Sequence, residues 1–239
     1  MCGIIGYIGN KDPVPILFKG LKRLEYRGYD SSGMALLEED NLTHIKKAGK
    51  VSDLQQLVDD SSIKGNCGIA HTRWATHGAP NDINAHPHLD HTGSIALVHN
   101  GIFENYEAIK QLLINRNIKF TSDTDTEVIV QLISELYYNN NEKLSFEDAV
   151  RAALQEVVGA YGIVTVCADE PNKIIAARMG SPLVLGIGEG EYFLASDASP
   201  IIEHTRNVIY LDDDEFVIID KAGYSISNIK SKKIISKSL

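Results

Sequence analysis

The segment Cys2-Gly3-Ile4-Ile5-Gly6-Tyr7-Ile8-Gly9 opens the chain as an apolar run interrupted by glycines. Such a run predicts a short buried strand, and its glycines let another backbone or a ligand approach closely. Removal of Met1 would place a free α-amine beside the Cys2 thiol. Because a model thiol has a pKa of about 8.5 and an α-amine one of about 7.7 to 8.0, the amine can serve as the base for the thiol, directly or through one water. The alternative interpretation is a cysteine that only fills a buried strand.

The composition is that of an ordinary globular chain. Of 239 residues, 44% are hydrophobic and 23% are charged, which is typical of soluble domains. The formal net charge of −9 argues against a nucleic-acid or anionic-membrane partner, because such interfaces need clustered Lys and Arg. The sequence has neither a long apolar run nor the segments of a signal peptide, so it predicts no membrane span and a cytoplasmic location.

The cysteines and histidines do not indicate a metal site. Cys2, Cys67 and Cys167 lie far apart without CxxC spacing, which argues against both a disulfide framework and a zinc knot. Cys67 and Cys167 lie in apolar stretches that are typical of buried small hydrophobes. The segment His86-Pro-His88-Leu-Asp90-His91 lies in a predicted loop, and its spacing does not match that of a tetrahedral metal site. The sequence therefore predicts neither a metal ion nor a cofactor.

Hydrophobic periodicity predicts strands, then helices, then strands again. Because hairpin-length connections cannot join parallel strands, this order favours an α+β fold with mostly antiparallel sheets. Ser52 and Ser145 are the expected caps of two helices. The expected helices cover residues 13–24, 51–58, 105–115, 124–138 and 145–159, and the expected strands cover 2–9, 33–37, 42–47, 67–72, 94–99, 163–168, 173–178, 183–187, 192–195, 208–211 and 216–219.

Three polar segments at the ends of these elements carry candidate chemistry. Arg73-Trp74-Ala75-Thr76-His77-Gly78 follows a strand, and its Arg fork can bind a carboxylate while its Trp excludes water as the loop closes. His99-Asn100-Gly101 combines a side-chain amide with a backbone N–H, as an oxyanion hole does, although Asn-Gly also forms simple turns. Ser122 to Glu127 introduces a helix, so its polar groups are either caps or a carboxylate for a substrate ammonium.

Together these segments resemble a known family. From Cys2 to about the last fifteen residues, the chain resembles the glutaminase domain of glutamine–fructose-6-phosphate aminotransferases, a branch of the class II glutamine amidotransferases. The Cys2 start and the Asn100-Gly101 pair are shared by class II enzymes generally, whereas Glu25-Tyr-Arg-Gly-Tyr-Asp-Ser31 and Arg73-Trp-Ala-Thr-His-Gly78 look specific to the aminosugar branch. The segments that carry the resemblance are Cys2-Gly-Ile-Ile-Gly, Leu24-Glu-Tyr-Arg27-Gly-Tyr-Asp-Ser31, His71-Thr-Arg73-Trp74-Ala-Thr76-His77-Gly78, Asn84-Ala-His86-Pro-His88, Val98-His-Asn100-Gly101 and Ser122 to Glu127.

The resemblance implies a fold, an activity and a set of site residues. The implied fold is the N-terminal-nucleophile hydrolase fold, a four-layer αββα sandwich of two stacked antiparallel sheets. The implied activity is hydrolysis of L-glutamine to glutamate and ammonia through a cysteinyl thioester, as the ammonia-supplying half of glucosamine-6-phosphate synthesis. The implied roles are Cys2 as nucleophile, Asn100 and Gly101 as oxyanion hole, Arg73 with Thr76 and His77 for the α-carboxylate, Asp125 for the α-ammonium, Trp74 in a mobile lid, and Arg27 and His86 in support.

The resemblance also implies how the chain is divided. The amidotransferase domain is expected over residues 1–225, with a tail or the start of a linker over 226–239. The sugar-phosphate isomerase domain of the full-length family does not occur in this sequence and is the expected partner. Two alternatives stay open. Another class II branch, such as the phosphoribosyl-pyrophosphate or asparagine enzymes, should not need the Arg27 and Arg73-Trp74 segments in this form. The second alternative is a module that binds glutamine or another protein but catalyses no reaction.

Overall fold

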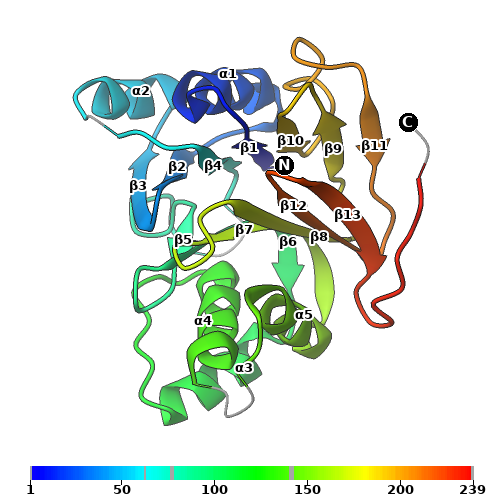
Figure 1. Ribbon diagram of the computed structural model, residues 1–239. Helices are drawn as coiled ribbons and strands as arrows, with labels where there is room; N and C mark the ends of the chain where they lie inside the picture. The colour runs from blue at the N-terminus through cyan, green and yellow to red at the C-terminus, as the bar shows by residue number, and fades with distance from the viewer. Residues whose placement is uncertain (1, 62, 76–77, 140–142, 238–239) are drawn as a thin grey trace.

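The computed structural model describes residues 2–61, 63–75, 78–139 and 143–237. These residues form four layers: two helices, a seven-stranded sheet, a six-stranded sheet and three further helices (Figure 1). Neighbouring strands within each sheet pair antiparallel. The expected α+β sandwich of two stacked antiparallel sheets is therefore confirmed.

The two sheets draw their strands from both halves of the chain. The seven-stranded sheet has the order β11-β9-β10-β1-β4-β2-β3, and the six-stranded sheet has the order β13-β12-β8-β7-β6-β5. The strands are β1 (Gly3–Ile8), β2 (Ser31–Glu38), β3 (Asn41–Ala48), β4 (Cys67–Arg73), β5 (His88–Leu89), β6 (Ile95–Phe103), β7 (Gly159–Cys167), β8 (Lys173–Met179), β9 (Val184–Ile187), β10 (Tyr192–Ala195), β11 (Val208–Tyr210), β12 (Glu215–Asp220) and β13 (Gly223–Asn228).

The helices cover the outer faces of the sheets (Figure 1). They are α1 (Pro13–Leu24), α2 (Val51–Asp59), α3 (Tyr106–Asn115), α4 (Asp125–Tyr138) and α5 (Phe146–Glu156), with a short 3₁₀ turn η1 (Glu25–Arg27) after α1. Within the described ranges, no helix has the length and hydropathy needed to cross a membrane. Side-chain oxygens of Asp12, Thr124 and Ser145 accept backbone N–H groups at the starts of α1, α4 and α5, which satisfies donors that a helix start leaves open.

The cap expected at Ser52 is wrong. Helix α2 begins at Val51, so Ser52 lies inside its first turn. The Lys50 N–H instead donates to the Asp53 carboxylate at 2.9 Å. An acidic side chain in the first turn can satisfy the donor at the cap position, and its charge also suits the positive end of the helix dipole.

Strand β1 lies between β10 and β4 in the middle of its sheet and is buried on both faces. Ile4 and Ile8 face the core between the two sheets, whereas Ile5 and Tyr7 pack with α1, as the two-residue period of a strand requires. A Cβ atom at Gly20 of α1 would lie 2.8 Å from Ile5 Cγ1. This glycine therefore lets the helix lie close against the strand.

The last strand was not expected from the sequence. Strand β13 pairs with β12 along the edge of the six-stranded sheet and continues past the division expected after residue 225. Ile226 and Ile229 are buried, so this part of the chain belongs to the sandwich. Its Ser- and Asn-rich sequence conceals the strand because only alternate residues of an edge strand need to be apolar.

Removing volume from the core between the sheets should destabilise the fold strongly. Ile69 is fully buried there, whereas Ile202 is 59% exposed. We expect Ile69→Ala to lower the free energy of unfolding by about 2 to 5 kcal/mol and Ile202→Ala to lower it by less than about 0.5 kcal/mol. Urea unfolding followed by circular dichroism measures both; equal losses would contradict this description of the core.

Candidate functional site

A cavity of about 470 Å³ lies beside the start of β1, the end of β4 and the last residues of β6. Residues from both sheets and from the start of α4 line it, so it gathers segments far apart in the sequence. Among the residues named from the sequence, Cys2, Arg27, Arg73, Trp74, His86, Asn100, Gly101 and Asp125 line this cavity. Thr76 and His77 lie outside the described residues, and the roles of all ten stay predictions.

The Cys2 sulfur is held against the backbone of Trp74. The Trp74 N–H donates to Cys2 Sγ at 3.1 Å, and the thiol lies 3.5 Å from the Trp74 carbonyl oxygen. Burial raises the pKa of the Cys2 thiol, and the bond from Trp74 opposes this effect without cancelling it. The thiol is therefore protonated near neutral pH and needs a base before it can act as a nucleophile.

Two side chains hold the carbonyl oxygen of Cys2. Arg27 donates its Nε–H to it at 2.9 Å, and Asn100 Nδ2 lies 3.3 Å away. The Arg27 Nη1 also lies 3.2 Å from Asp197 Oδ2, just after β10. Arg27 thus links the start of the chain to the adjacent strand, which is a positioning role for the cysteine.

Asn100 and Gly101 lie on β6, opposite Cys2. Asn100 Nδ2 donates to Ser196 Oγ at 2.8 Å, and Asn100 Oδ1 lies 2.9 Å from His71 Nε2. Gly101 has φ +133°, and a Cβ there would lie 2.0 Å from the Ala160 carbonyl oxygen. Only glycine fits this position, so the sequence pair Asn-Gly is a backbone requirement as well as a chemical one.

Arg73 ends strand β4 beside the cavity, and Trp74 follows it. The Arg73 guanidinium is buried, lies 3.9 Å from Asp30 Oδ1 and donates to the carbonyl oxygens of Gly78 and Ala79. Trp74 is 54% exposed. Its ring lies so close to Gly28 that a Cβ there would meet it at 2.8 Å. The cavity thus has a cation on its floor and an exposed aromatic side chain at its rim.

Asp125 is the first residue of α4, and its carboxylate is buried beside the cavity. One oxygen accepts the Phe103 N–H at 2.9 Å, which ties α4 to β6. The positive end of the helix dipole favours a negative charge at this position. The site therefore contains an anionic and a cationic group, Asp125 and Arg73, around the cysteine.

Three histidines near the cavity, His71, His86 and His88, are buried, and His86 lines the cavity itself. The His71 and His86 rings stack with centroids 4.2 Å apart, and His86 Nε2 lies 3.0 Å from Thr126 Oγ1. Burial lowers the pKa of His71 to about 3 and lowers the pKa values of His86 and His88 well below their usual range. All three rings are neutral at physiological pH.

Sequence reasoning missed the contacts that Ser196 and His71 make with Asn100. Ser196 follows β10 directly and accepts both the Ile4 N–H, at 2.7 Å, and the Asn100 amide. A polar residue immediately after a strand was the same pattern that singled out the Arg73 segment. His71 lay inside a quoted motif, but its contact with Asn100 crosses from one sheet to the other.

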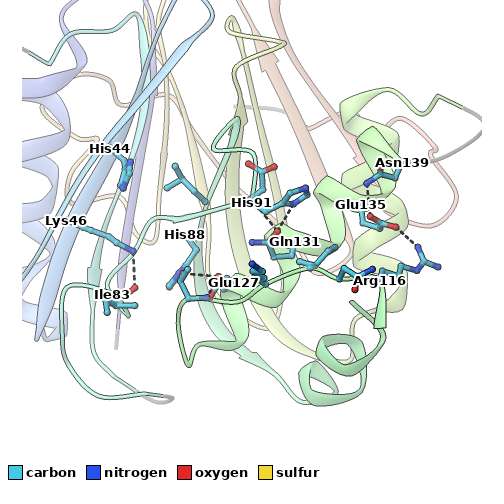
Figure 2. A pocket seen from close by; sticks show the side chains of 16 residues that line it. His44, Lys46, Ile83, His88, His91, Arg116, Glu127, Gln131, Glu135 and Asn139 are labelled. Atoms are coloured by element: carbon cyan, nitrogen blue, oxygen red, sulfur yellow. Dashed lines mark hydrogen bonds and ion pairs between the residues drawn. The ribbon is translucent and has the colours of Figure 1, made fainter. Parts of the chain in front are cut away.

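A larger cavity of about 720 Å³ lies between β3, β5 and α4. Two of its cations are already held: Lys46 Nζ donates to the carbonyl oxygens of Ile83 and Ala85, and Arg116 pairs with Glu135 at 2.8 Å (Figure 2). Because two of its cations are held in this way and its lining contains neither cysteine nor serine, whereas Cys2 lines the smaller cavity, the smaller cavity is the better candidate site. Across the described part of the chain, no group of three or more His, Cys, Asp or Glu side chains is arranged to hold a metal ion.

Comparisons of sequence point to one family. The family described as "Glutamine amidotransferase domain" matches residues 57–230. The glutamine–fructose-6-phosphate aminotransferase [isomerizing] of Chlorobaculum tepidum is 53% identical over 234 residues, which cover 97% of this chain and 38% of that protein. The enzyme of the same name from Bacteroides thetaiotaomicron is 53% identical over 242 residues, covering 99% and 39%. The chain thus spans less than half the length of these relatives.

Solved structures share the fold. A glutamine phosphoribosylpyrophosphate amidotransferase from B. subtilis superposes with a TM-score of 0.82 at 27% identity, covering 96% of this chain and 50% of that one. A structure described as the allosteric regulatory enzyme of purine biosynthesis gives 0.84 at 27% identity, covering 97% and 50%. The whole sandwich therefore has counterparts in larger enzymes.

The neutral histidines should make the fold sensitive to mild acid. Their pKa values are lower in the folded than in the unfolded chain, so the unfolded chain binds more protons below about pH 6.5. We expect the free energy of unfolding to keep the full contribution of these histidines above that pH. Below it, the free energy of unfolding should fall by up to about 1.4 kcal/mol per pH unit for each histidine. Urea unfolding at several pH values from 7.5 to 5 measures this, and His88→Gln should reduce the slope. A stability that stays flat down to pH 5 would contradict the description of these rings.

Proposed function

Because the chain belongs to the glutamine amidotransferase domain family, we propose that it hydrolyses L-glutamine to glutamate and ammonia through a thioester at Cys2. One observation supports this most: the Cys2 sulfur, the Asn100 amide and the charged groups of Arg73 and Asp125 meet in one cavity of about 470 Å³. This reaction requires a nucleophile, hydrogen-bond donors for an oxyanion, and one charged group each for the carboxylate and the ammonium of an amino acid.

The first half-reaction forms the thioester. After loss of Met1, the Cys2 α-amine accepts the thiol proton, directly or through one water, and the sulfur attacks the side-chain carbonyl carbon of glutamine. The carbonyl electron pair moves to oxygen, where the Asn100 Nδ2–H and the Gly101 N–H stabilise the negative charge. When that pair returns, the carbon–nitrogen bond breaks and the ammonium form of the amine gives its proton to the leaving nitrogen. Ammonia and a γ-glutamyl thioester result.

The second half-reaction restores the cysteine. Water attacks the thioester carbon while the α-amine accepts one of its protons, and the same donors stabilise the second oxyanion. The carbon–sulfur bond then breaks, the sulfur recovers a proton, and glutamate leaves. The sum is glutamine plus water giving glutamate plus ammonia.

Substrate binding follows from the charges of the cavity. We assign the glutamine α-carboxylate to Arg73, with help from Thr76 and His77, and the α-ammonium to Asp125. A guanidinium binds a carboxylate through two parallel hydrogen bonds, and a buried carboxylate favours a cation nearby. Trp74, exposed at the rim, would cover the bound substrate and exclude water.

The ammonia would serve glucosamine-6-phosphate synthesis. This rests on the 53% identity to enzymes named glutamine–fructose-6-phosphate aminotransferase, against 27% to the phosphoribosylpyrophosphate enzyme. Since the chain spans only 38% to 39% of those aminotransferases, the acceptor chemistry requires a sugar-phosphate isomerase partner. A cytoplasmic location, as the sequence indicates, agrees with that metabolic role.

Loss of the oxyanion donor should abolish most turnover without affecting the thiol. We expect Asn100→Ala to lower kcat by about a hundredfold or more, measured as ammonia release from glutamine, while iodoacetamide still alkylates Cys2. Asn10→Ala, on an exposed turn, is the matched control and should leave kcat unchanged. Full glutaminase activity in the Cys2→Ala variant would contradict the proposal.

The α-amine gives a second test. A chain that keeps Met1 has a peptide amide in place of the amine, and an amide nitrogen is not basic, so this form should be inactive. Intact mass spectrometry of separated processed and unprocessed protein, combined with glutaminase assays of each, measures this. Good turnover by a sample that fully retains Met1 would rule out the amine as base.

A further inference from the structure

We propose that His71 is a positioning residue for the oxyanion hole: its Nε2–H holds the Asn100 side-chain oxygen, so that the Asn100 amide nitrogen faces Cys2. The inference deepens the proposed glutaminase function and rests on it. The contact between the two residues joins the two sheets beneath the cavity.

The position of His71 makes the contact rigid. His71 is fully buried on β4, on the same strand face as Ile69, which packs in the core between the sheets. Its ring therefore points away from its own sheet and reaches Asn100 on β6 of the other sheet. Stacking of the ring on His86 further limits its rotation.

A backbone carbonyl decides which ring nitrogen of His71 carries the proton. His71 Nε2 lies 3.0 Å from the His99 carbonyl oxygen and 2.9 Å from Asn100 Oδ1. A carbonyl oxygen can only accept, so Nε2 must be the donor. Nδ1 is buried and has no hydrogen-bond partner within the described ranges, as suits a nitrogen without a proton. Burial lowers the pKa of His71 to about 3, so the ring has one proton, on Nε2.

A second backbone carbonyl decides the orientation of the Asn100 amide from the other side. The Cys2 carbonyl oxygen lies 3.3 Å from Asn100 Nδ2 and can only accept. If the amide were rotated, Asn100 Oδ1 would face the Cys2 carbonyl oxygen, and the amide N–H groups would face the His71 Nε2–H. The contact at His71 and the contact at Cys2 both require the same orientation of the Asn100 amide. The carbonyl oxygens of His99 and Cys2 therefore determine that orientation.

This orientation matters because the developing oxyanion is the one part of the substrate on which the Asn100 amide is proposed to act. With the His71 donor removed, Asn100 Oδ1 loses its buried donor. The contacts of Asn100 Nδ2 with Cys2 and Ser196 then hold the amide alone, and orientations with the oxygen toward the developing negative charge become more populated. An interaction made only in the transition state affects kcat and leaves substrate binding nearly unchanged. A role limited to core packing would instead change stability without this split.

The test compares three replacements of His71. Phe keeps a buried ring without a donor, Gln carries an amide N–H at about the reach of Nε2, and Asn carries the same amide on a shorter side chain. For His71→Phe and His71→Asn we expect kcat for glutamine hydrolysis to fall about ten- to a hundredfold, with KM changed less than about threefold. His71→Gln should recover most of kcat. Equal activity in all three, or a loss expressed in KM, would overturn the inference.

Two controls separate positioning from stability. His88→Phe removes an equally buried histidine that does not contact Asn100 and should reduce stability without lowering kcat. In the Asn100→Ala background, His71→Phe should have almost no further effect on kcat, because the group that it positions is gone. A full additional loss in that background would contradict the proposal.

One measurement is independent of activity. Nitrogen-15 NMR of the resting protein reports which His71 nitrogen carries the proton, and we expect Nε2. A proton on Nδ1 would overturn the inference even in an active enzyme. Conversely, if the processed wild-type protein releases no ammonia, the proposed function fails while the tautomer still tests the arrangement of His71 and Asn100.

Discussion

The hydrophobic layer between the two sheets is the constraint on which the rest of the structure depends. Cys2 precedes β1 and Arg73 ends β4 in one sheet, whereas Asn100 and Gly101 lie on β6 in the other. Their separation is therefore set by how the sheets stack, about 10 Å apart. Because protein interiors are packed as densely as organic crystals, this distance cannot drift, and groups nearly a hundred residues apart stay within reach of one another.

The same burial that builds this layer also sets the protonation states at its polar end. It raises the pKa of the Cys2 thiol and lowers that of His71, because both groups are less stable as ions away from water. A neutral thiol requires a base, and a neutral histidine makes a reliable single donor. Hydrogen bonds are also stronger in such surroundings, which suits a network that must hold Asn100 in one orientation.

Local patterns predicted most of the elements, and their failures have local reasons. The helices around Ile16, Val128 and Val150 begin within one residue of their expected starts because their apolar spacing and caps agree with each other. The last of them ends at Glu156, before the expected residue 159, because Gly159 already belongs to β7. The cap at Ser52 failed because Asp53 satisfies the same donor from inside the helix. Strand β13 was missed because an edge strand needs apolar residues only at alternate positions, and its polar residues resemble those of a loop.

The sequence by itself determined the alternation of strands and helices, the antiparallel sheets and the chemical groups at the strand ends. It indicated that a cysteine, an amide, a guanidinium and a carboxylate were available. Only the tertiary structure decided that they line one cavity and that Ser196 and His71 both contact Asn100. The physical reason is that a two-residue period shows which face of a strand is buried, whereas contacts across the interior depend on the relative placement of two sheets, which no local pattern encodes.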